Sequence, residues 1–387
     1  MAALHNSRGN VLRELQRFED SLQCYDRAIA LQGDYAHAHN NRGVVLQELK
    51  LFDQAMGSYA KAIECEPTYV DAYWNQSLCA LLVGDFAKGW PLFEQWRWAY
   101  QADSPERFEP RKRWLGQEDV HGKTILLVHQ EKRHLGFGDT LHFCRYASAV
   151  AQLGAQVVLE VQPALKNLLG SLAGVSRVLA RGEDLPHFDL YCPLISLPLA
   201  FQADLSNITG RPYLSVDVQK VQAWRVQMPA DGKMKIGLAW SGSTWDRSDH
   251  NRSMGLSDMT TLLDDNAHFY CVQNEIRAAD KATLAQTRKI AFVGDAHQDF
   301  GDTAALMENL DLVITIDTSV AHLAGALGKP VWVLLGAHAD WRWLQGRRDS
   351  PWYESLRLFR QPKLGDWASV LREVQAALRE FLDQQHS

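Results

Sequence analysis

Residues 312–335 read LVITIDTSVAHLAGALGKPVWVLL and carry the pattern of one complete βαβ unit. Two short apolar runs, 312–316 and 331–335, are typical of strands that are buried on both faces. Between them, residues 319–327 are small or apolar at helical spacing, and the Gly-Lys-Pro sequence that follows ends the helix. The stretch therefore predicts two parallel strands joined by a helix that packs closely on the sheet.

The same alternation of strands and helices extends on both sides of this unit. Further buried strands are predicted at 123–129, 156–161, 175–180, 188–192, 235–240, 268–272 and 290–293. Helices are predicted at 140–153, 164–173, 259–264, 303–309 and 367–384. The pattern predicts two doubly wound α/β halves, residues 115–225 and 234–362, and a C-terminal helix within 363–387, with ligands beyond the carboxyl ends of the strands.

Residues 1–103 have a different pattern, which repeats every 34 residues. Small residues recur in two columns and aromatic residues in a third: Gly9, Gly43 and Ser77; Ser21, Ala55 and Gly89; Tyr25, Tyr59 and Phe93. Two antiparallel helices approach closely only where the facing side chains are small, so each unit predicts one helix pair. The pattern resembles the tetratricopeptide repeat, with a third unit that drifts and is expected to cap the array and dock on the next domain.

The composition excludes several classes of function. The 387 residues carry a net charge of −6, which disfavours non-specific binding to nucleic acid or anionic membranes. The six cysteines are scattered without a C-x-x-C pair, and neither a signal sequence nor an apolar run of about 18 residues occurs. We therefore expect a cytoplasmic protein with no transmembrane segment and no nucleic-acid partner.

The centre of the opening stretch carries the first candidate site, made of Asp317, Thr318, Ser319 and His322. A strand ends at Asp317, and Thr318 or Ser319 is expected to cap the following helix. The amide groups of a first helical turn suit a phosphate or sugar oxygens, and His322 lies about one turn further along. The alternative is a capped core helix whose histidine has only structural partners.

A second candidate site is the turn after the first strand of the N-terminal half, where Gly136, Gly138, Asp139 and Thr140 form a glycine-rich start to a helix. The glycines permit a tight turn and close approach of the backbone to an acceptor. Asp139 is expected at the helix start, facing the ligand. Since aspartate is also a favoured capping residue, Asp139 has the alternative role of an N-cap.

Two loops of the C-terminal half complete the candidate donor site. Ser241 and Gly242 follow one strand, with Arg252 nearby, and Arg252 is a suitable bidentate partner for a diphosphate. Gln273 and Glu275 follow the next strand, where an acidic residue often binds ribose hydroxyls. Each loop has the alternative of being a solvated surface turn. No D-x-D metal motif stands out, so we expect no metal site and no cofactor other than the donor substrate.

These motifs resemble those of the bacterial heptosyltransferases, and the whole chain resembles a repeat-containing group of related glycosyltransferases. The resemblance implies a GT-B fold preceded by an all-α solenoid, and inverting, metal-independent transfer from a nucleotide sugar. Asp139 would be the general base on the acceptor, with His134 as a second candidate, and Arg252 would neutralise the leaving diphosphate. Ser319 replaces the glycine that the family often has, and residues 131–134 lengthen its usual turn.

Some alternatives remain open at this stage. The repeats are expected to bind a protein or peptide partner, or else to be a structural extension without a ligand. The α/β body has two alternatives to transfer: an inactive scaffold, or a nucleotide-sugar epimerase that needs no acceptor. The aromatic residues within 340–344 and 349–353 are expected either to stack on the sugar or base, or to pack the loop on the body.

Overall fold

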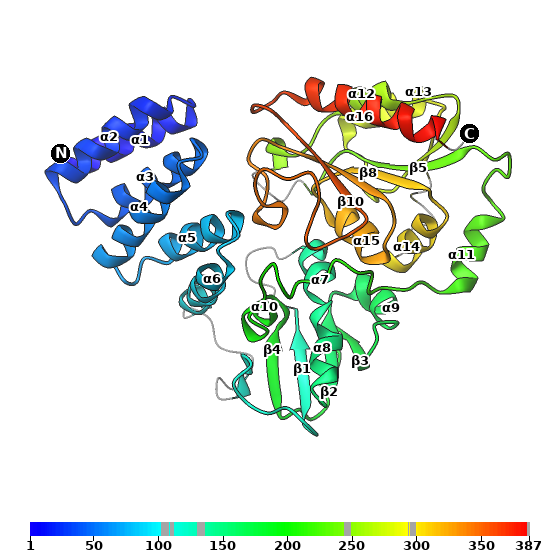
Figure 1. Cartoon of the computed structure of the whole chain (residues 1–387), viewed down its shortest axis with the longest axis horizontal. Helices are drawn as coiled ribbons and strands as arrows, with labels where there is room; N and C mark the ends of the chain where they lie inside the picture. The colour runs from blue at the N-terminus through cyan, green and yellow to red at the C-terminus, as the bar shows by residue number, and fades with distance from the viewer. Residues whose placement is uncertain are drawn as a thin grey trace. The chain divides into compact units, whose positions relative to one another are not determined.

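The computed structural model describes residues 1–101, 108, 112–129, 136–243, 249–292, 294 and 299–384 (Figure 1). They form two compact units. The helical unit comprises Met1–Arg111 together with the short segments Pro198–Asn207 and Asp340–Gly346, and the α/β unit comprises the rest of the chain. Each unit is described on its own below.

The helical unit contains three antiparallel helix pairs, α1 (Ala2–Glu14) with α2 (Phe18–Leu31), α3 (Ala36–Glu48) with α4 (Phe52–Cys65), and α5 (Val70–Leu82) with α6 (Phe86–Gln101). The close approach explains the small residues. A β-carbon added to Gly9 would lie 2.5 Å from Cε1 of Tyr25, and one added to Gly43 would lie 2.5 Å from Cε1 of Tyr59. The repeat predicted from the 34-residue period is therefore confirmed.

The third repeat packs on the two distant segments that belong to the helical unit. The indole Nε1 of Trp90 donates a hydrogen bond to the carbonyl oxygen of Ala203 at 2.8 Å. The ring of Trp90 also meets that of Trp341 edge to face, with centroids 5.2 Å apart. The sequence pattern placed both segments in the α/β halves, because nothing local links them to a helix pair. Trp341 thus packs on the repeats and not on the α/β body, where one of its two alternatives placed it.

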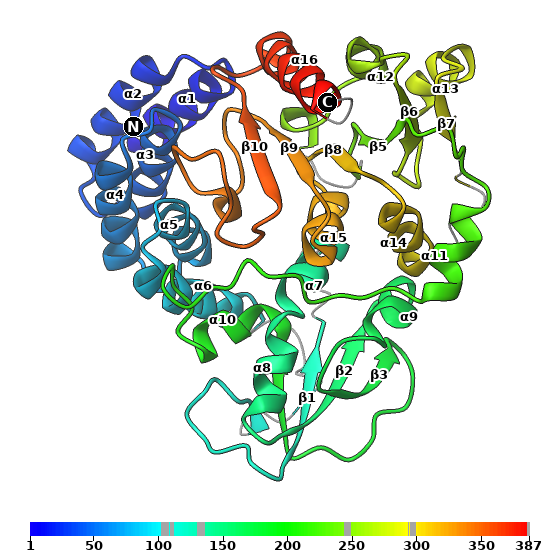
Figure 2. The same cartoon turned by 45° about the vertical axis from the view of Figure 1, so that its right-hand side comes forward.

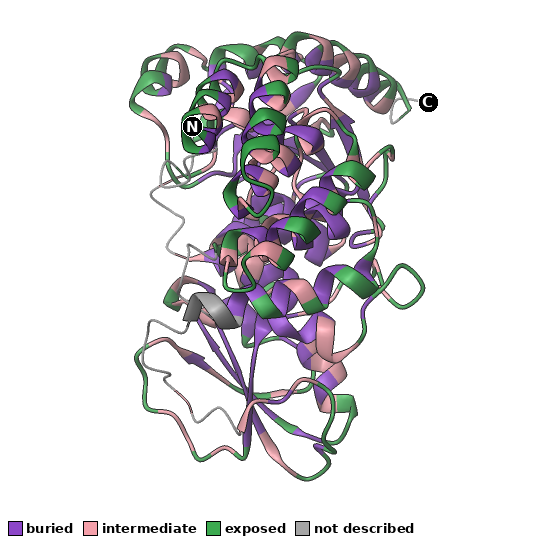
Figure 3. Ribbon diagram, turned by 90° about the vertical axis from the view of Figure 1, so that its left-hand side faces the viewer, coloured by how far each residue is buried: buried purple, intermediate pink, exposed green. Residues whose placement is uncertain are grey.

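The α/β unit contains a smaller and a larger sheet. The smaller one is parallel, with strand order β3-β2-β1-β4, and its central strands are buried along most of their length (Figure 3). The strands of this sheet and the helices around them are β1 (Thr124–Val128), α7 (Phe137–Phe143), α8 (Tyr146–Gln152), β2 (Gln156–Val161), α9 (Lys166–Leu169), β3 (Val175–Ala180) and β4 (Leu190–Pro193). The next helix, α10 (Leu197–Ala200), lies almost wholly in the segment that belongs to the helical unit. The helix predicted over 140–153 is in fact two helices, α7 and α8, and the one predicted over 164–173 is a 3₁₀ turn at Pro163–Leu165 followed by the short helix α9.

The larger sheet is also parallel, with strand order β10-β9-β8-β5-β6-β7 (Figure 2). Its elements are α11 (Val218–Arg225), β5 (Met234–Ala239), α12 (Leu256–Met259), β6 (Ala267–Cys271), α13 (Ala278–Gln286), β7 (Ile290–Phe292), α14 (Phe300–Glu308), β8 (Leu312–Ile316), α15 (Ser319–Leu327), β9 (Val331–Leu335), β10 (Leu356–Arg360) and α16 (Trp367–Asp383). The pattern missed β10, and the helix predicted at 259–264 is α12 followed by a 3₁₀ turn. The opening βαβ unit is confirmed as β8, α15 and β9.

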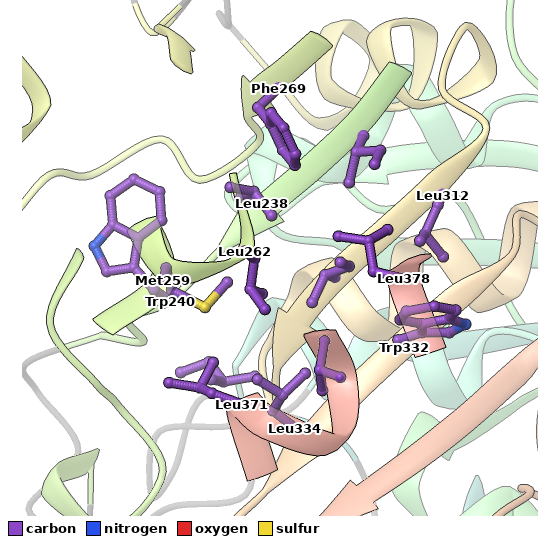
Figure 4. Close-up of a cluster of buried hydrophobic side chains, with 14 of the residues drawn as sticks. Leu238, Trp240, Met259, Leu262, Phe269, Leu312, Trp332, Leu334, Leu371 and Leu378 are labelled. Carbon is purple, nitrogen blue, oxygen red and sulfur yellow. The ribbon is translucent and has the colours of Figure 1, made fainter. Parts of the chain in front are cut away.

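The amphipathic helix α16 closes the core of the larger sheet. Its Leu371 and Leu378 lie in one buried cluster with strand residues such as Leu238 and Leu334 (Figure 4). Burying each of these side chains contributes about 2 kcal/mol to stability. With one face covered by α16 and the strands parallel, the carboxyl ends of β5, β6 and β8 share one edge, from which the candidate loops leave.

Candidate functional site

The turn from β8 to α15 is closed by a side-chain cap. The hydroxyl of Thr318 accepts the Val320 N–H at 3.3 Å, and the extended backbone of Thr318 is typical of an N-cap. At its other end α15 stops at Gly328, whose φ of 75° is left-handed. The predicted helix and its Thr318 cap are therefore confirmed.

A cation lies beside this turn. Nη1 of Arg252 donates to the carbonyl oxygen of Asp317 at 3.2 Å, so its guanidinium adjoins the residue before the cap. Its Nε donates to Oδ1 of Asp249 at 3.2 Å, which holds the guanidinium from the other side. The structure thus brings together Arg252 and the Asp317–Thr318 turn, which are far apart in the sequence.

The sequence reasoning missed a second arginine in this cluster. Arg277 donates to Oδ2 of Asp249, to the carbonyl oxygen of Gly242 at 3.0 Å and to Oγ of Ser253 at 3.1 Å. A β-carbon on Gly242 would lie 2.5 Å from Oδ1 of Asp249, so a larger residue here would displace this carboxylate. One buried carboxylate therefore orients two arginines that follow different strands.

Gln273 joins the ends of β5 and β6. Its Oε1 accepts the N–H groups of Trp240 at 2.8 Å and Ser241 at 3.2 Å, and its Nε2 donates to Oγ of Ser241 at 3.0 Å and to the carbonyl oxygen of Glu275 at 2.9 Å. All four hydrogen-bonding positions of the amide are therefore occupied within the protein. The side chain of Glu275 is exposed, and its role toward a ribose stays a prediction.

The turn from β1 to α7 is closed by Asp139. Its Oδ2 accepts the N–H of Gly136 at 2.8 Å, so Gly136 is the N-cap, and Asp139, considered as an N-cap from the sequence, is instead the third residue of α7. A β-carbon on Gly138 would lie 2.9 Å from Cδ2 of His322 and 3.6 Å from Cα of Ser319. The first turns of α7 and α15 therefore touch, and Gly138 allows that approach. His134 lies outside the described residues.

Thr140 was predicted in the acceptor loop, but its side chain is buried. Its hydroxyl donates to Oε1 of Gln162 at 2.8 Å and lies 3.0 Å from Nδ1 of His129. Burial, with a smaller effect from Arg181, lowers the pKa of His129 to about 4. His129 is therefore neutral at pH 7, and since the single hydroxyl proton goes to Gln162, Nδ1–H of His129 donates to Thr140.

His322 has a partner that the sequence reasoning did not assign to the site. The hydroxyl of Tyr353 lies 2.9 Å from Nδ1 of His322 and 3.1 Å from Nδ1 of His142, which comes from α7. A β-carbon on Gly325 would lie 2.5 Å from the Tyr353 ring, so the ring occupies the space that this glycine leaves. The only signals for this pair were the aromatic block at 349–353 and the histidine that ends the glycine-rich motif.

No group of three or more His, Cys, Asp or Glu side chains with metal-ligand proximity occurs among the described residues. In the same part of the chain, no helix combines the length and the apolar character needed to cross a membrane.

Comparisons with known proteins agree with these features. Residues 9–50 match the family model described as TPR repeat, residues 36–69 the one described as tetratricopeptide repeat, and residues 273–370 the one described as glycosyltransferase family 9 (heptosyltransferase). Helical repeats thus precede a glycosyltransferase domain of the heptosyltransferase type.

One curated relative and one solved structure extend over more of the chain. Protein FlbA of Caulobacter vibrioides is 24% identical over 327 residues, which is 78% of this chain and 54% of FlbA. The chain therefore spans about half the length of this relative. The crystal structure of the glycosyl transferase family 9 from Veillonella parvula DSM 2008 superposes with a TM-score of 0.51 at 10% identity, over 69% of this chain and 99% of that one. This likeness shows a GT-B-like fold for the α/β unit.

Proposed function

We propose that this repeat-containing chain with a heptosyltransferase-type domain transfers a sugar from a nucleotide diphosphate sugar to an acceptor hydroxyl, with inversion and without a metal ion. The observation that carries the proposal is the meeting of two helix starts: α15, with Arg252 beside it, and α7, with Asp139 in its first turn. Donor chemistry and acceptor chemistry would then lie next to each other.

The α15 side suits the leaving group. Negative charge builds up on a diphosphate as its bond to the sugar breaks, and a positioned cation stabilises that charge. Arg252 supplies the cation, and the start of α15 supplies the positive end of a helix dipole. Arg252 is already oriented by Asp249 and Asp317, so little side-chain ordering is needed on binding. This arrangement would neutralise the diphosphate without a metal.

The α7 side suits the acceptor. Oδ2 of Asp139 accepts the N–H of Gly136, which fixes the carboxylate at the helix start. A fixed carboxylate that comes within hydrogen-bond reach of a hydroxyl acts as a general base. The base would remove the hydroxyl proton as the hydroxyl attacks the anomeric carbon opposite the leaving diphosphate, which inverts that centre.

We assign acceptor recruitment to the helical unit, with a protein or peptide as the partner. Its support is the confirmed repeat and a shallow hollow on α2, α3 and α4, lined among others by Asp26, Arg42 and Lys61. Charged side chains around a hollow favour a polar partner over a lipid. The six cysteines are all free thiols, as expected in the reducing cytoplasm, where we place the reaction.

The test has two stages. A thermal-shift screen with UDP, GDP, ADP and CDP and their sugars identifies the donor, and the protein is then incubated with that donor and candidate acceptors in the presence of EDTA. Release of the nucleotide only when an acceptor is present, with Arg252→Gln at least tenfold slower, is the expected result. Conversion of the donor sugar without an acceptor would indicate an epimerase. Absence of both binding and turnover would indicate a scaffold, and either outcome overturns the proposal.

A further inference from the structure

Two histidines on different helices of the α/β unit share one hydroxyl group. His142 lies on α7 and His322 on α15, and the hydroxyl of Tyr353 is 3.1 Å from Nδ1 of the first and 2.9 Å from Nδ1 of the second. His142 and Tyr353 are fully buried, and His322 is 5% exposed. The hydrogen bonds among the three side chains are therefore shielded from competition by water.

The number of protons restricts this arrangement. A tyrosine hydroxyl has a single hydrogen, so it can donate to only one Nδ1, and the other Nδ1 reaches it only by donating its own hydrogen. The guanidinium of Arg145 lies 4.6 Å from the centre of the Tyr353 ring, and a nearby positive charge disfavours a second one on either imidazole. When Tyr353 donates to one neutral ring, that ring carries its proton on Nε2, and the neutral ring that donates to Tyr353 carries its proton on Nδ1.

We propose that Tyr353 is a positioning residue that holds His322 in the Nε2–H form, as a hydrogen-bond donor at the start of α15. Tyr353 gives its hydrogen to Nδ1 of His322, the nearer acceptor, and accepts Nδ1–H from His142. Nε2 of His322 then presents its hydrogen near the first turn of α7, 3.6 Å from where a β-carbon of Gly138 would be. A donor here suits an anionic or hydroxyl oxygen of the nucleotide sugar, so this step rests on the proposed function.

The neighbouring Tyr213 provides a matched comparison. It also stacks on Arg145, but its hydroxyl donates to the carbonyl oxygen of Leu141 at 2.6 Å and accepts from Arg145 at 3.3 Å. Tyr213→Phe therefore removes a hydroxyl of a half-buried ring beside the same arginine; this hydroxyl bonds neither histidine, although it also interacts with the Tyr353 side chain. Tyr353→Phe keeps the ring that packs on Gly325 and removes only the shared hydroxyl.

The tautomers are measurable by long-range ¹H–¹⁵N correlation spectra of the full chain labelled at its histidine rings, with signals assigned through His142→Asn and His322→Asn. We expect Nε2–H on His322 and Nδ1–H on His142 in the wild type and in Tyr213→Phe. In Tyr353→Phe, His322 should become a mixture of both forms. Affinity for the tightest binder among UDP, GDP, ADP, CDP and inorganic pyrophosphate should fall about tenfold in Tyr353→Phe and stay unchanged in Tyr213→Phe.

The spectra test this inference even if no sugar transfer is detected. Nδ1–H on His322 in the wild type, or on both histidines together, would show that Tyr353 does not donate to His322 and would overturn it. Unchanged tautomers in Tyr353→Phe would do the same. Correct tautomers without turnover would leave this inference standing and refute only the proposed function.

Discussion

The turns from β1 to α7 and from β8 to α15 have the same topology but opposite electrostatics. Each follows a parallel strand inside its sheet and opens a helix. At α15 a neutral hydroxyl, that of Thr318, caps the helix, and Arg252 lies beside it. At α7 the N-cap is Gly136, which has no side chain, and the carboxylate of Asp139 binds its amide.

The two kinds of cap favour different ligands. A helix start with a neutral cap and an adjacent cation attracts phosphate. A helix start that already carries a carboxylate repels phosphate, but that carboxylate can accept a proton from a neutral hydroxyl. Under the proposed function, the same fold element would thus serve donor and acceptor, depending on which oxygen closes its first turn.

The largest expected effect comes from removing the charge at α7 while keeping its cap. In Asp139→Asn the carboxamide oxygen still accepts the Gly136 N–H, but it cannot take a proton at neutral pH. We expect kcat to fall about 10²- to 10⁴-fold, with an unchanged melting temperature and nucleotide Kd. Asp217→Asn, at the exposed N-cap of α11, removes the same charge and should leave kcat unchanged. A loss of less than threefold in Asp139→Asn would exclude Asp139 as the base.

The second expected effect concerns the side-chain contact that joins each turn to the strand before it. His129, just after β1, bonds Thr140 on α7, whereas Thr315 of β8 lies 3.4 Å from the hydroxyl of Thr318. Of these two contacts, the one made by His129 involves a group that titrates in the accessible pH range. Because folding lowers the pKa of His129 from 6.5 to about 4, its contribution to stability is complete above pH 6.5 and is lost as the pH falls toward 4.

We therefore expect the free energy of unfolding of the wild type to fall by about 3 kcal/mol more than that of His129→Asn between pH 7 and pH 4. Urea unfolding of both proteins across this range measures the difference, in which the contributions of other acidic groups cancel. Thr315→Ser is the control and should follow the wild type. Parallel curves for wild type and His129→Asn would show that His129 does not titrate between the folded and unfolded states.

Much of the fold was predictable because each buried parallel strand is a continuous apolar run, and each helix pair needs small residues opposite an aromatic ring. β10 was missed because residues 356–360, Leu-Arg-Leu-Phe-Arg, include two arginines and so do not form the continuous apolar run of the other strands; β10 lies at the edge of its sheet. The joining of Pro198–Asn207 and Asp340–Gly346 to the repeats was also missed. It depends on Trp90 meeting partners more than 100 residues away, which no local pattern reports.

The site was predictable where one turn supplies its own residues, as with Thr318 and Asp139. It was not predictable where loops from different strands meet, because only the folded sheet brings these loops together. Arg277 and Tyr353 are of this second kind. Gln273 was named as a candidate because it follows a strand. In the structure, its hydrogen bonds to Trp240 and Ser241 join the ends of β5 and β6.

The smallest expected effect tests whether the cap at α15 does more than stabilise its helix. Thr318→Ala removes the acceptor for the Val320 N–H and should cost about 1 kcal/mol of stability. Asp217→Ala removes a similar cap from α11, whose hydrogen bond to the Gln219 N–H is 2.8 Å, and should cost about the same. Only Thr318→Ala should also weaken nucleotide binding in a calorimetric titration, about threefold, because it loosens the first turn beside Arg252. Equal affinities in the two variants would mean that the α15 turn does not contact the donor, and that the contrast between the two helix starts is structural alone.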